Sequence, residues 1–171
     1  VIPCNKKRAL SRPVAIGEGL KVKINTNIGL APAEKNIERE LTKLSQAIEH
    51  GADTVMDLSI SDNLRECRNA ILAASTVPVG TVPIYEAAHR AEKRYGTFEK
   101  MSFDDIYAVL ENQAAAGVDF FTIHAGILKK TLAQLKRKKR VGGIVSRGGA
   151  ILARWMTINK KENPLYENFE R

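Results

Sequence analysis

The stretch GVDFFTIHAG, at residues 117–126, is a helix stop followed by a short apolar run and then a polar cluster. A nearly continuous apolar run is expected of a strand that is buried on both faces, as in a parallel sheet. Four other runs end in the same way, at residues 24–27 (INTN), 56–59 (MDLS), 83–85 (PIY) and 145–149 (VSRGG). Because the carboxyl ends of strands in a parallel barrel share one mouth, these clusters are predicted to form one wall of a binding site.

Segments with helical periodicity lie between these runs. Strands are predicted at residues 21–24, 54–58, 77–84, 118–123 and 143–145, and helices at 33–50, 62–74, 86–95, 102–117, 128–138 and 150–158. Residues 1–20 are expected to be an irregular lead-in, because two prolines and two glycines interrupt any period. Alternating strands and helices predict a parallel α/β architecture. Five strands are too few for an eight-stranded barrel of about 250 residues, so an open doubly wound sheet and part of a longer barrel both remain possible.

A weak internal repeat supports this architecture. Residues 51–56 (GADTVM) and 117–122 (GVDFFT) each contain a helix stop, a small apolar residue, an aspartate and the start of a strand. Both segments follow a predicted helix.

Composition places the chain among ordinary globular domains. Of its 171 residues, 44% are hydrophobic and 27% are charged. No run approaches the roughly 20 apolar residues that span a bilayer, and the first residues carry no signal-peptide pattern. Cys4 and Cys67 indicate no disulfide framework, so the cytoplasm is the predicted location.

The net charge of +8 is concentrated in one region, because seven of the positive charges lie between residues 129 and 140. Such a run can bind nucleic acid or a phosphorylated ligand. A solvated helix end, where the helix dipole favours cations, is the simpler interpretation and the one we adopt.

Four side chains at the predicted strand ends are candidates for ligand contact. Asn25 and Asn27 alternate around Thr26, so in a strand both amides point the same way and can bind a ligand or satisfy loop backbone. Met56 can pack on a flat heterocycle or fill the core. Tyr85 can end a strand at the site or lie half-buried in the core.

His124 is a candidate acid, base or hydrogen-bond partner, although a structural role is the commoner one for a single histidine. The three histidines of the chain show no metal-ligand spacing. Residues 146–149 (SRGG), between a predicted strand and a helix, combine a hydroxyl, a guanidinium and free N–H groups. That combination suits a phosphate at a helix N-terminus, and a plain glycine turn is the alternative.

Taken in order, the five clusters resemble the phosphomethylpyrimidine synthase family of thiamine biosynthesis and the related 5-hydroxybenzimidazole synthases. The matching segments are residues 23–29, 51–59, 80–85, 117–126 and 143–149, with further support from 161–163 (KEN) and 165–166 (LY). The resemblance implies a (β/α)8 TIM-type barrel, of which residues 21–171 would supply about five βα units as its N-terminal portion. It also implies aminoimidazole ribotide as the substrate. The implied substrate contacts are Asn27, Met56, Tyr85, His124, Ser146, Arg147 and Gly148.

The same resemblance implies a radical carbon–carbon lyase that uses S-adenosylmethionine and a [4Fe-4S] cluster, with a zinc ion, and that acts as a homodimer. The family's cluster cysteines and metal-binding histidines lie beyond the last residue of this chain. Cys4 and Cys67 cannot replace a three-cysteine site. We therefore expect an N-terminal fragment that depends on a missing C-terminal portion and is inactive alone. No catalytic residue and no metal ligand is assigned within it.

The product is expected to be 5-hydroxybenzimidazole, with the thiamine pyrimidine phosphate as the alternative. Residues 59–63 (SISDN), Met156 and the pair at 159–160 depart from the pyrimidine synthase pattern, and these departures favour the benzimidazole branch. A basic nucleic-acid-binding domain is a more distant alternative. A sugar-phosphate isomerase or aldolase ranks lowest, because no lysine lies at a predicted strand end.

Overall fold

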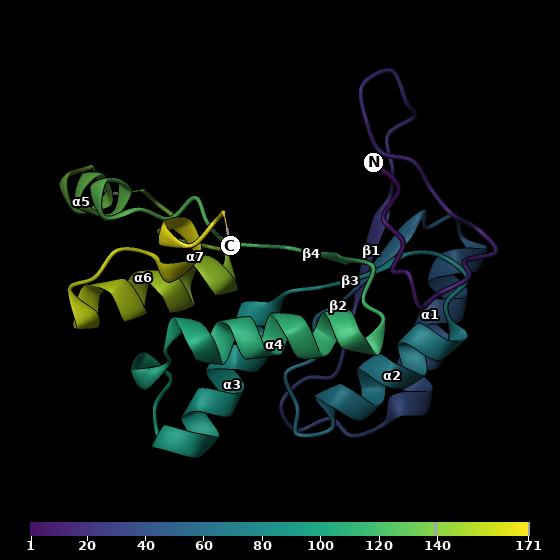
Figure 1. The fold of residues 1–171 in the computed structure, drawn as a ribbon, viewed down its shortest axis with the longest axis horizontal. Helices are drawn as coiled ribbons and strands as arrows, with labels where there is room; N and C mark the ends of the chain where they lie inside the picture. Colours follow the sequence, from purple (N-terminus) through teal and green to yellow (C-terminus); the bar gives the residue numbers. More distant parts are fainter. Residues whose placement is uncertain (139, 171) are drawn as a thin grey trace. The chain divides into compact units, whose positions relative to one another are not determined.

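The computed structural model describes residues 1–138 and 140–170, and within them it shows an α/β fold, as predicted. The elements in chain order are β1 (Asn25–Ile28), α1 (Ile37–Glu49), β2 (Thr54–Asp57), α2 (Leu64–Ala74), β3 (Val79–Thr81), α3 (Pro83–Tyr95), the 3₁₀ helix η1 (Phe98–Lys100), α4 (Phe103–Ala116), β4 (Phe120–Phe121), α5 (Lys129–Arg137), α6 (Arg147–Asn159) and α7 (Pro164–Glu167) (Figure 1). None of the helices in the described residues has the length and apolarity needed to cross a bilayer.

The chain divides into two compact units, which are described separately. The sheet unit comprises Val1–Glu86 and Val109–Thr122, and it holds β1 to β4 with α1 and α2. The helical unit comprises Ala87–Ala108 and Ile123–Arg171, and it holds η1, α5, α6 and α7.

In the sheet unit, the four strands form one parallel sheet in the order β1-β2-β3-β4. Asn27 of β1 pairs with Met56 of β2, which pairs with Gly80 of β3. Gly80 pairs in turn with Phe120 of β4, and a Cβ at Gly80 would lie 2.3 Å from the Phe120 ring. The absence of a side chain at Gly80 is therefore what leaves room for this ring. Because all four strands run the same way, their carboxyl ends lie along one edge.

One face of the sheet packs against α1 and α2 to form the core of this unit. Its buried members are Ile28, Leu30, Leu44, Ala52, Val55, Cys67, Ile71, Leu72, Val77, Val79 and Val118. The apolar side of α1 faces this core, because Leu44 is buried and Ile37, Leu41 and Ile48 pack against the same cluster. On α2 the apolar residues Leu64, Cys67, Ile71 and Leu72 are buried in the same way. Full burial of each large aliphatic side chain stabilises the fold by about 1.5–3 kcal/mol.

Two aspartates fix the pairing of neighbouring strands in the same way. The N–H of Asp53 donates to the carbonyl of Ile24 at 2.9 Å, and the N–H of Ile24 donates back to Asp53 Oδ2 at 2.8 Å. The N–H of Asp119 donates to the carbonyl of Val79 at 2.9 Å, and the N–H of Val79 donates back to Asp119 Oδ2 at 2.8 Å. The internal repeat in the sequence thus corresponds to a repeated structural device that sets the register of β1 with β2 and of β3 with β4.

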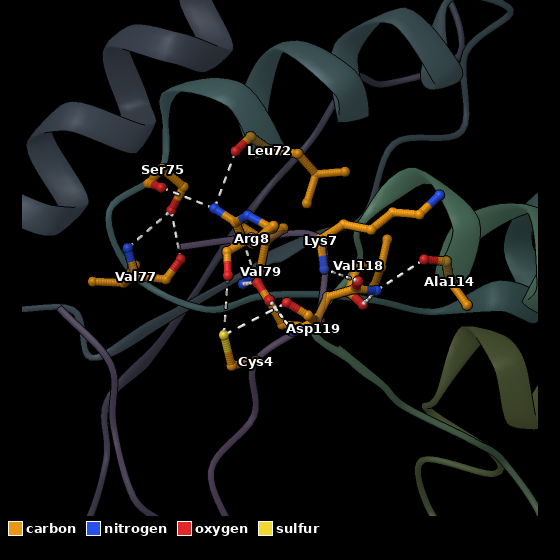
Figure 2. A network of polar contacts seen from close by, with 11 residues as sticks. Cys4, Lys7, Arg8, Leu72, Ser75, Val77, Val79, Ala114, Val118 and Asp119 are labelled. Carbon is orange, nitrogen blue, oxygen red and sulfur yellow. Dashed lines mark hydrogen bonds and ion pairs between the residues drawn. The ribbon is translucent and has the colours of Figure 1, made fainter. Parts of the chain in front are cut away.

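The N-terminal segment has no helix or strand before residue 25, yet part of it is tightly held on the sheet unit (Figure 2). The guanidinium of Arg8 forms an ion pair with Asp119 and donates to the carbonyls of Leu72 at 3.0 Å and Ser75 at 2.8 Å. The N–H of Asn5 donates to the other carboxylate oxygen of Asp119 at 2.8 Å. Asp119 therefore holds both a strand and the N-terminal segment.

In the helical unit, a capping box opens α4. Ser102 Oγ accepts from the N–H of Asp105 at 3.1 Å, and Asp105 Oδ2 accepts from the N–H of Ser102 at 2.8 Å. An aspartate thus fills the position usually taken by glutamate. The indole of Trp155 in α6 donates to the carbonyl of Met101 at 2.7 Å, and Arg154 forms an ion pair with Glu99 at 2.6 Å. These contacts hold α6 against η1 and the start of α4.

Three strand predictions need correction. The first strand begins at Asn25 rather than spanning residues 21–24, so the polar cluster is itself the strand. The third strand ends at Thr81 rather than at residue 84, because Pro83 opens α3, where its fixed φ and missing N–H are tolerated. The strand predicted at 118–123 is shorter than expected, since β4 spans only Phe120–Phe121, both partly exposed.

The fifth predicted strand, at residues 143–145, is wrong. No strand is assigned there, and the described residues contain four strands. Gly143 has a φ of +55°, outside the strand region, and Val145 is 80% exposed. Without burial of its apolar side chains, this short segment lacks the packing that favours an extended strand.

Candidate functional site

The candidate residues fall into two parts, which belong to different units and are described separately. In the sheet unit, Asn25 and Asn27 of β1 lie on the same side of the strand, as predicted. Asn25 Nδ2 donates to Asn27 Oδ1 at 3.2 Å, and Asn25 Oδ1 accepts from the hydroxyl of Thr54 at 2.9 Å. Asn25 is thereby held by neighbours on both sides. Asn27 is exposed, and its amide is available to a ligand at the carboxyl edge.

Met56 is the partner of Asn27 in the sheet register. Its thioether sulfur accepts a hydrogen bond from the hydroxyl of Thr122 at 3.7 Å. Asn27 and Met56 alternate with the core residues Ile28 and Val55, so they lie on the sheet face opposite the core. This face presents an amide next to a polarizable sulfur, a combination that can contact a flat heterocycle.

Tyr85 is not at a strand end. It lies in the first turn of α3, two residues after Pro83, and is partly buried. The sequence prediction placed it at the end of a longer third strand. The helix begins earlier than predicted, so the direction of the side chain is set by helical rather than strand geometry.

Asp57 ends β2 but is buried on the core side. Burial raises the pKa of its carboxyl, while hydrogen bonds from Ser59 oppose the shift. Asp57 Oδ1 accepts from the N–H of Ser59 at 2.9 Å and from its hydroxyl at 2.5 Å. These bonds stabilise the turn after β2, which indicates a structural role.

In the helical unit, His124 is the centre of the second part. Its Nε2 lies 3.0 Å from Ser146 Oγ, and its Nδ1 is buried with no hydrogen-bond partner among the described residues. Burial lowers the pKa of the imidazole below its usual 6.5. The ring is therefore favoured in its neutral form, in which one nitrogen donates and the other accepts.

Ser146 and the glycines after it form the N-terminus of α6. Ser146 is the N-cap, and its hydroxyl oxygen accepts from the N–H of Gly149 at 3.2 Å. A Cβ at Gly148 would lie 2.4–2.7 Å from three atoms of the His124 ring, so the ring occupies the space that a side chain would need. Arg147 is the first residue of α6 and is exposed. The structure therefore brings four predicted site residues together at one helix N-terminus, where anions are stabilised.

A cavity of about 480 Å³ opens beside this helix start. Gly126, Ile127, Val145 and Ser146 contribute to its lining, together with residues of α5. His124 and Arg147 do not line it. The predicted anion site and this largely apolar cavity are therefore neighbours that share Ser146.

The basic run belongs mainly to α5. Lys136 and Arg137 lie in the last turn of this helix and are exposed, as a solvated helix end with cations near the negative end of the dipole requires. Lys138 is its C-cap. Lys139, which the sequence prediction includes in the run, lies outside the described residues.

The residues present do not fit the iron–sulfur cluster that the resemblance implies. Cys67 is fully buried in the core of the sheet unit, and burial raises the pKa of its thiol to about 11. Cys4 is exposed and donates weakly to the carbonyl of Arg8 at 3.6 Å. A cluster site needs several thiolates. Among the described residues no group of three or more histidine, cysteine or acidic side chains could hold a metal ion.

Two contacts escaped the sequence analysis. Thr122, which bonds to Met56, lies at a predicted strand end and could have been found from that position. Asn163 is fully buried, and its amide donates to the carbonyl of His124 at 2.8 Å. Only its place in the KEN segment pointed to Asn163, and sequence pattern gave no reason to connect it with a residue 39 positions earlier.

Comparison with known proteins gives consistent matches. The chain matches the radical SAM ThiC family over residues 1–171. It is 48% identical over 171 residues to the phosphomethylpyrimidine synthase of Desulforudis audaxviator, covering 100% of this chain and 40% of that protein. It is 53% identical over 160 residues to that of Thermodesulfovibrio yellowstonii, covering 94% and 38%. It is 51% identical over 170 residues to phosphomethylpyrimidine synthase 2 of Methanothermobacter thermautotrophicus, covering 99% of this chain and 40% of that protein.

These relatives bear on the expected product. The names of all three favour the pyrimidine, which was the alternative, over the expected benzimidazole. The chain spans about 40% of the length of these curated relatives.

Proposed function

Because the chain belongs to the radical SAM ThiC family, we propose that it binds aminoimidazole ribotide as part of a phosphomethylpyrimidine synthase. The observation that carries this proposal is the N-terminus of α6. There the Ser146 hydroxyl lies 3.0 Å from His124 Nε2, and Gly148 packs directly beneath the imidazole. Such an arrangement suits the phosphate of a ribotide, because main-chain N–H groups and the helix dipole both favour an anion.

Each candidate residue is assigned a binding role in this proposal. Arg147 neutralises the phosphate charge with a charge-assisted hydrogen bond. The Ser146 hydroxyl and the neutral His124 ring orient the ligand. In the sheet unit, Asn27 offers an amide to the imidazole of the substrate, and Met56 offers a polarizable contact surface. Tyr85 is retained as a substrate contact from the first turn of α3.

The family implies radical chemistry from S-adenosylmethionine and a [4Fe-4S] cluster, and that chemistry would supply hydrogen abstraction from the bound substrate. The described cysteines do not fit the cluster, so we assign these residues to substrate binding alone. The completed (β/α)8 barrel, the zinc ion and the homodimer stay predictions. We propose the pyrimidine as the product because the curated relatives are named for it.

Binding of aminoimidazole ribotide, measured by isothermal titration calorimetry, tests the proposal. Loss of a charge-assisted hydrogen bond removes about 1.5–3 kcal/mol, so Arg147→Ala is expected to weaken binding by at least about tenfold. The matched control replaces Lys136, Arg137 and Lys138 with glutamine, which removes more charge from the same unit and should change affinity little.

The opposite pattern would favour the nucleic-acid alternative. In that case the triple variant would lose salt-dependent binding to RNA or DNA, and Arg147→Ala would not matter. Anaerobic turnover with S-adenosylmethionine then identifies the product. Mass spectrometry distinguishes a phosphomethylpyrimidine from a hydroxybenzimidazole, and the latter would contradict the proposed product.

A further inference from the structure

His124 lies on a segment without helix or strand, between β4 and α5. Its ring nevertheless has a defined place over Gly148, where a Cβ would come within 2.4 Å of the ring. Contact with Ser146 alone cannot define this place, because a hydroxyl can follow a moving ring. The main chain of the segment must itself be held.

Asn163 supplies that hold. Its side chain is fully buried, and its amide nitrogen donates to the carbonyls of His124 at 2.8 Å, Ile127 at 3.1 Å and Ala125 at 3.4 Å. Its Oδ1 accepts from the N–H of Leu165 at 3.0 Å, as the N-cap of α7. One carboxamide therefore joins the His124 segment to a helix start 39 residues later.

The residue before Asn163 holds the other end of the same segment. The carboxylate of Glu162 accepts from the N–H of Lys129, the first residue of α5, at 3.0 and 3.3 Å. The segment from His124 to Lys129 is thus fixed at both ends by two consecutive side chains. A shift of its main chain would leave partly buried carbonyl groups unpaired, which is unfavourable by up to about 1–3 kcal/mol for each group.

We propose that Asn163 is a positioning residue for substrate binding, which fixes the His124 main chain so that the imidazole lies against the N-terminus of α6. The role in substrate binding rests on the proposed function, because His124 counts there as a substrate contact. The positioning itself is a property of the free protein and can be measured without ligand.

The test compares Asn163→Ser with Asn168→Ala. Serine can still cap α7 by accepting from Leu165, but it lacks the amide that reaches three carbonyls. Asn168 is a matched control, since its amide donates to the carbonyl of Pro164 at 2.8 Å in the same short helix, and no hydrogen bond joins it to the His124 segment in the described part of the chain. The readouts are the NMR resonance and pKa of the His124 ring, assigned with His124→Gln, and the affinity for inorganic phosphate.

In Asn163→Ser we expect the His124 resonance to move and its pKa to rise towards 6.5, because the released ring becomes hydrated. Phosphate affinity should fall by about tenfold, equivalent to about 1.4 kcal/mol. Asn168→Ala should change neither readout. An unchanged His124 resonance and pKa in folded Asn163→Ser would overturn the proposal, whatever happens to phosphate binding.

A failure of the proposed function gives a different result. If the unmodified protein binds neither phosphate nor aminoimidazole ribotide while Asn163→Ser still displaces the ring, the site assignment fails and the positioning stands. If Asn163→Ser does not fold, hydrogen exchange of the Asn163 carboxamide in the unmodified protein decides. Slow exchange supports the buried bonds, and exchange as fast as that of the exposed Asn36 overturns them.

Discussion

The guanidinium of Arg68 and the carboxylate of Glu86 form an ion pair at 2.6 Å with both side chains buried inside the sheet unit. Glu86 also accepts from the amide of Gln113 at 2.7 Å, and Gln113 accepts in turn from the hydroxyl of Thr81 at 2.6 Å. The network joins α2, the end of β3, the first turn of α3 and the second half of α4. Glu86 directly follows Tyr85 in the sequence, so the network anchors the helix turn that carries this candidate contact.

Removing one charge of this pair should be strongly destabilising. Glu86→Gln leaves the Arg68 charge buried without its carboxylate, and we expect a loss of about 3 kcal/mol in the free energy of unfolding. Urea denaturation measures it. The control is Arg94→Gln, which breaks an exposed pair with Asp105 at 3.7 Å and should change stability by less than about 1 kcal/mol. Equal effects of the two variants would contradict a buried pair.

Asp119 should contribute more to the free energy of unfolding than Asp53, although both set the register of neighbouring strands. Asp119→Asn removes a charge that holds Val79, Asn5 and the Arg8 guanidinium, so a loss of about 3 kcal/mol is expected. The described side-chain hydrogen bond of Asp53 is the one from the N–H of Ile24, so Asp53→Asn is expected to cost about 1 kcal/mol. Chemical denaturation of both variants tests the ranking, and a larger effect at Asp53 would refute it.

Asp57 predicts a pH dependence with a definite sign. Burial raises its pKa above the ordinary 3.8, so the folded state holds the proton more tightly than the unfolded state. Its contribution to stability is present below pH 3.8 and is lost as the pH rises through the folded-state pKa. The stability of Asp57→Asn relative to the unmodified protein should therefore increase with pH over this range. Denaturation curves at several pH values check the slope, and the opposite slope would show that the carboxylate is stabilised.

Gly148→Ala should weaken ligand binding at the candidate site more than it lowers the stability of the fold. The added Cβ would lie 2.4 Å from the His124 ring, so the ring must move away from Ser146. We expect phosphate binding to weaken by about tenfold. Gly126→Ala is the control, because a Cβ there meets nothing within 4 Å. Unaltered binding in Gly148→Ala would separate His124 from the ligand site.

The two thiols should react at very different rates. Cys4 is exposed, whereas Cys67 is buried and burial raises its pKa to about 11. With a thiol reagent at about pH 8, one thiol should react at once and the second only as the protein unfolds. Cys4→Ser identifies the fast thiol. Rapid reaction of both thiols in the native protein would contradict the buried position of Cys67.

Periodicity located the helices well because burial imposes it. Leu44 in α1 and Ile71 in α2 each belong to an apolar series at helical spacing, and both are buried in the core of the sheet unit. Strand ends were less predictable, because a few residues must be assigned from local composition alone. Pro83 illustrates the difficulty, since a proline can end a strand or open a helix, and the choice here moved Tyr85 into α3.

The candidate site was likewise predictable only in part. Residues 146–149 were predicted from local chemistry and do form a capped helix N-terminus. The role of Asn163 could not be predicted, because it depends on carbonyl groups brought to it by the fold rather than on any spacing in the sequence. The aspartates at 53 and 119 were visible as a repeat, but only the structure shows that each binds the preceding strand in the sheet order.

The hold of Asp119 on Arg8 has a consequence for the order of assembly. The two residues are 111 positions apart, so during synthesis the N-terminal segment emerges long before its partner exists. It can dock only after β4 has been made and aligned with β3. Closing so long a loop follows the formation of local contacts. Within the sheet unit, the segment that carries Arg8 is therefore the last to find its place, and its protection from protease would report that the sheet is complete.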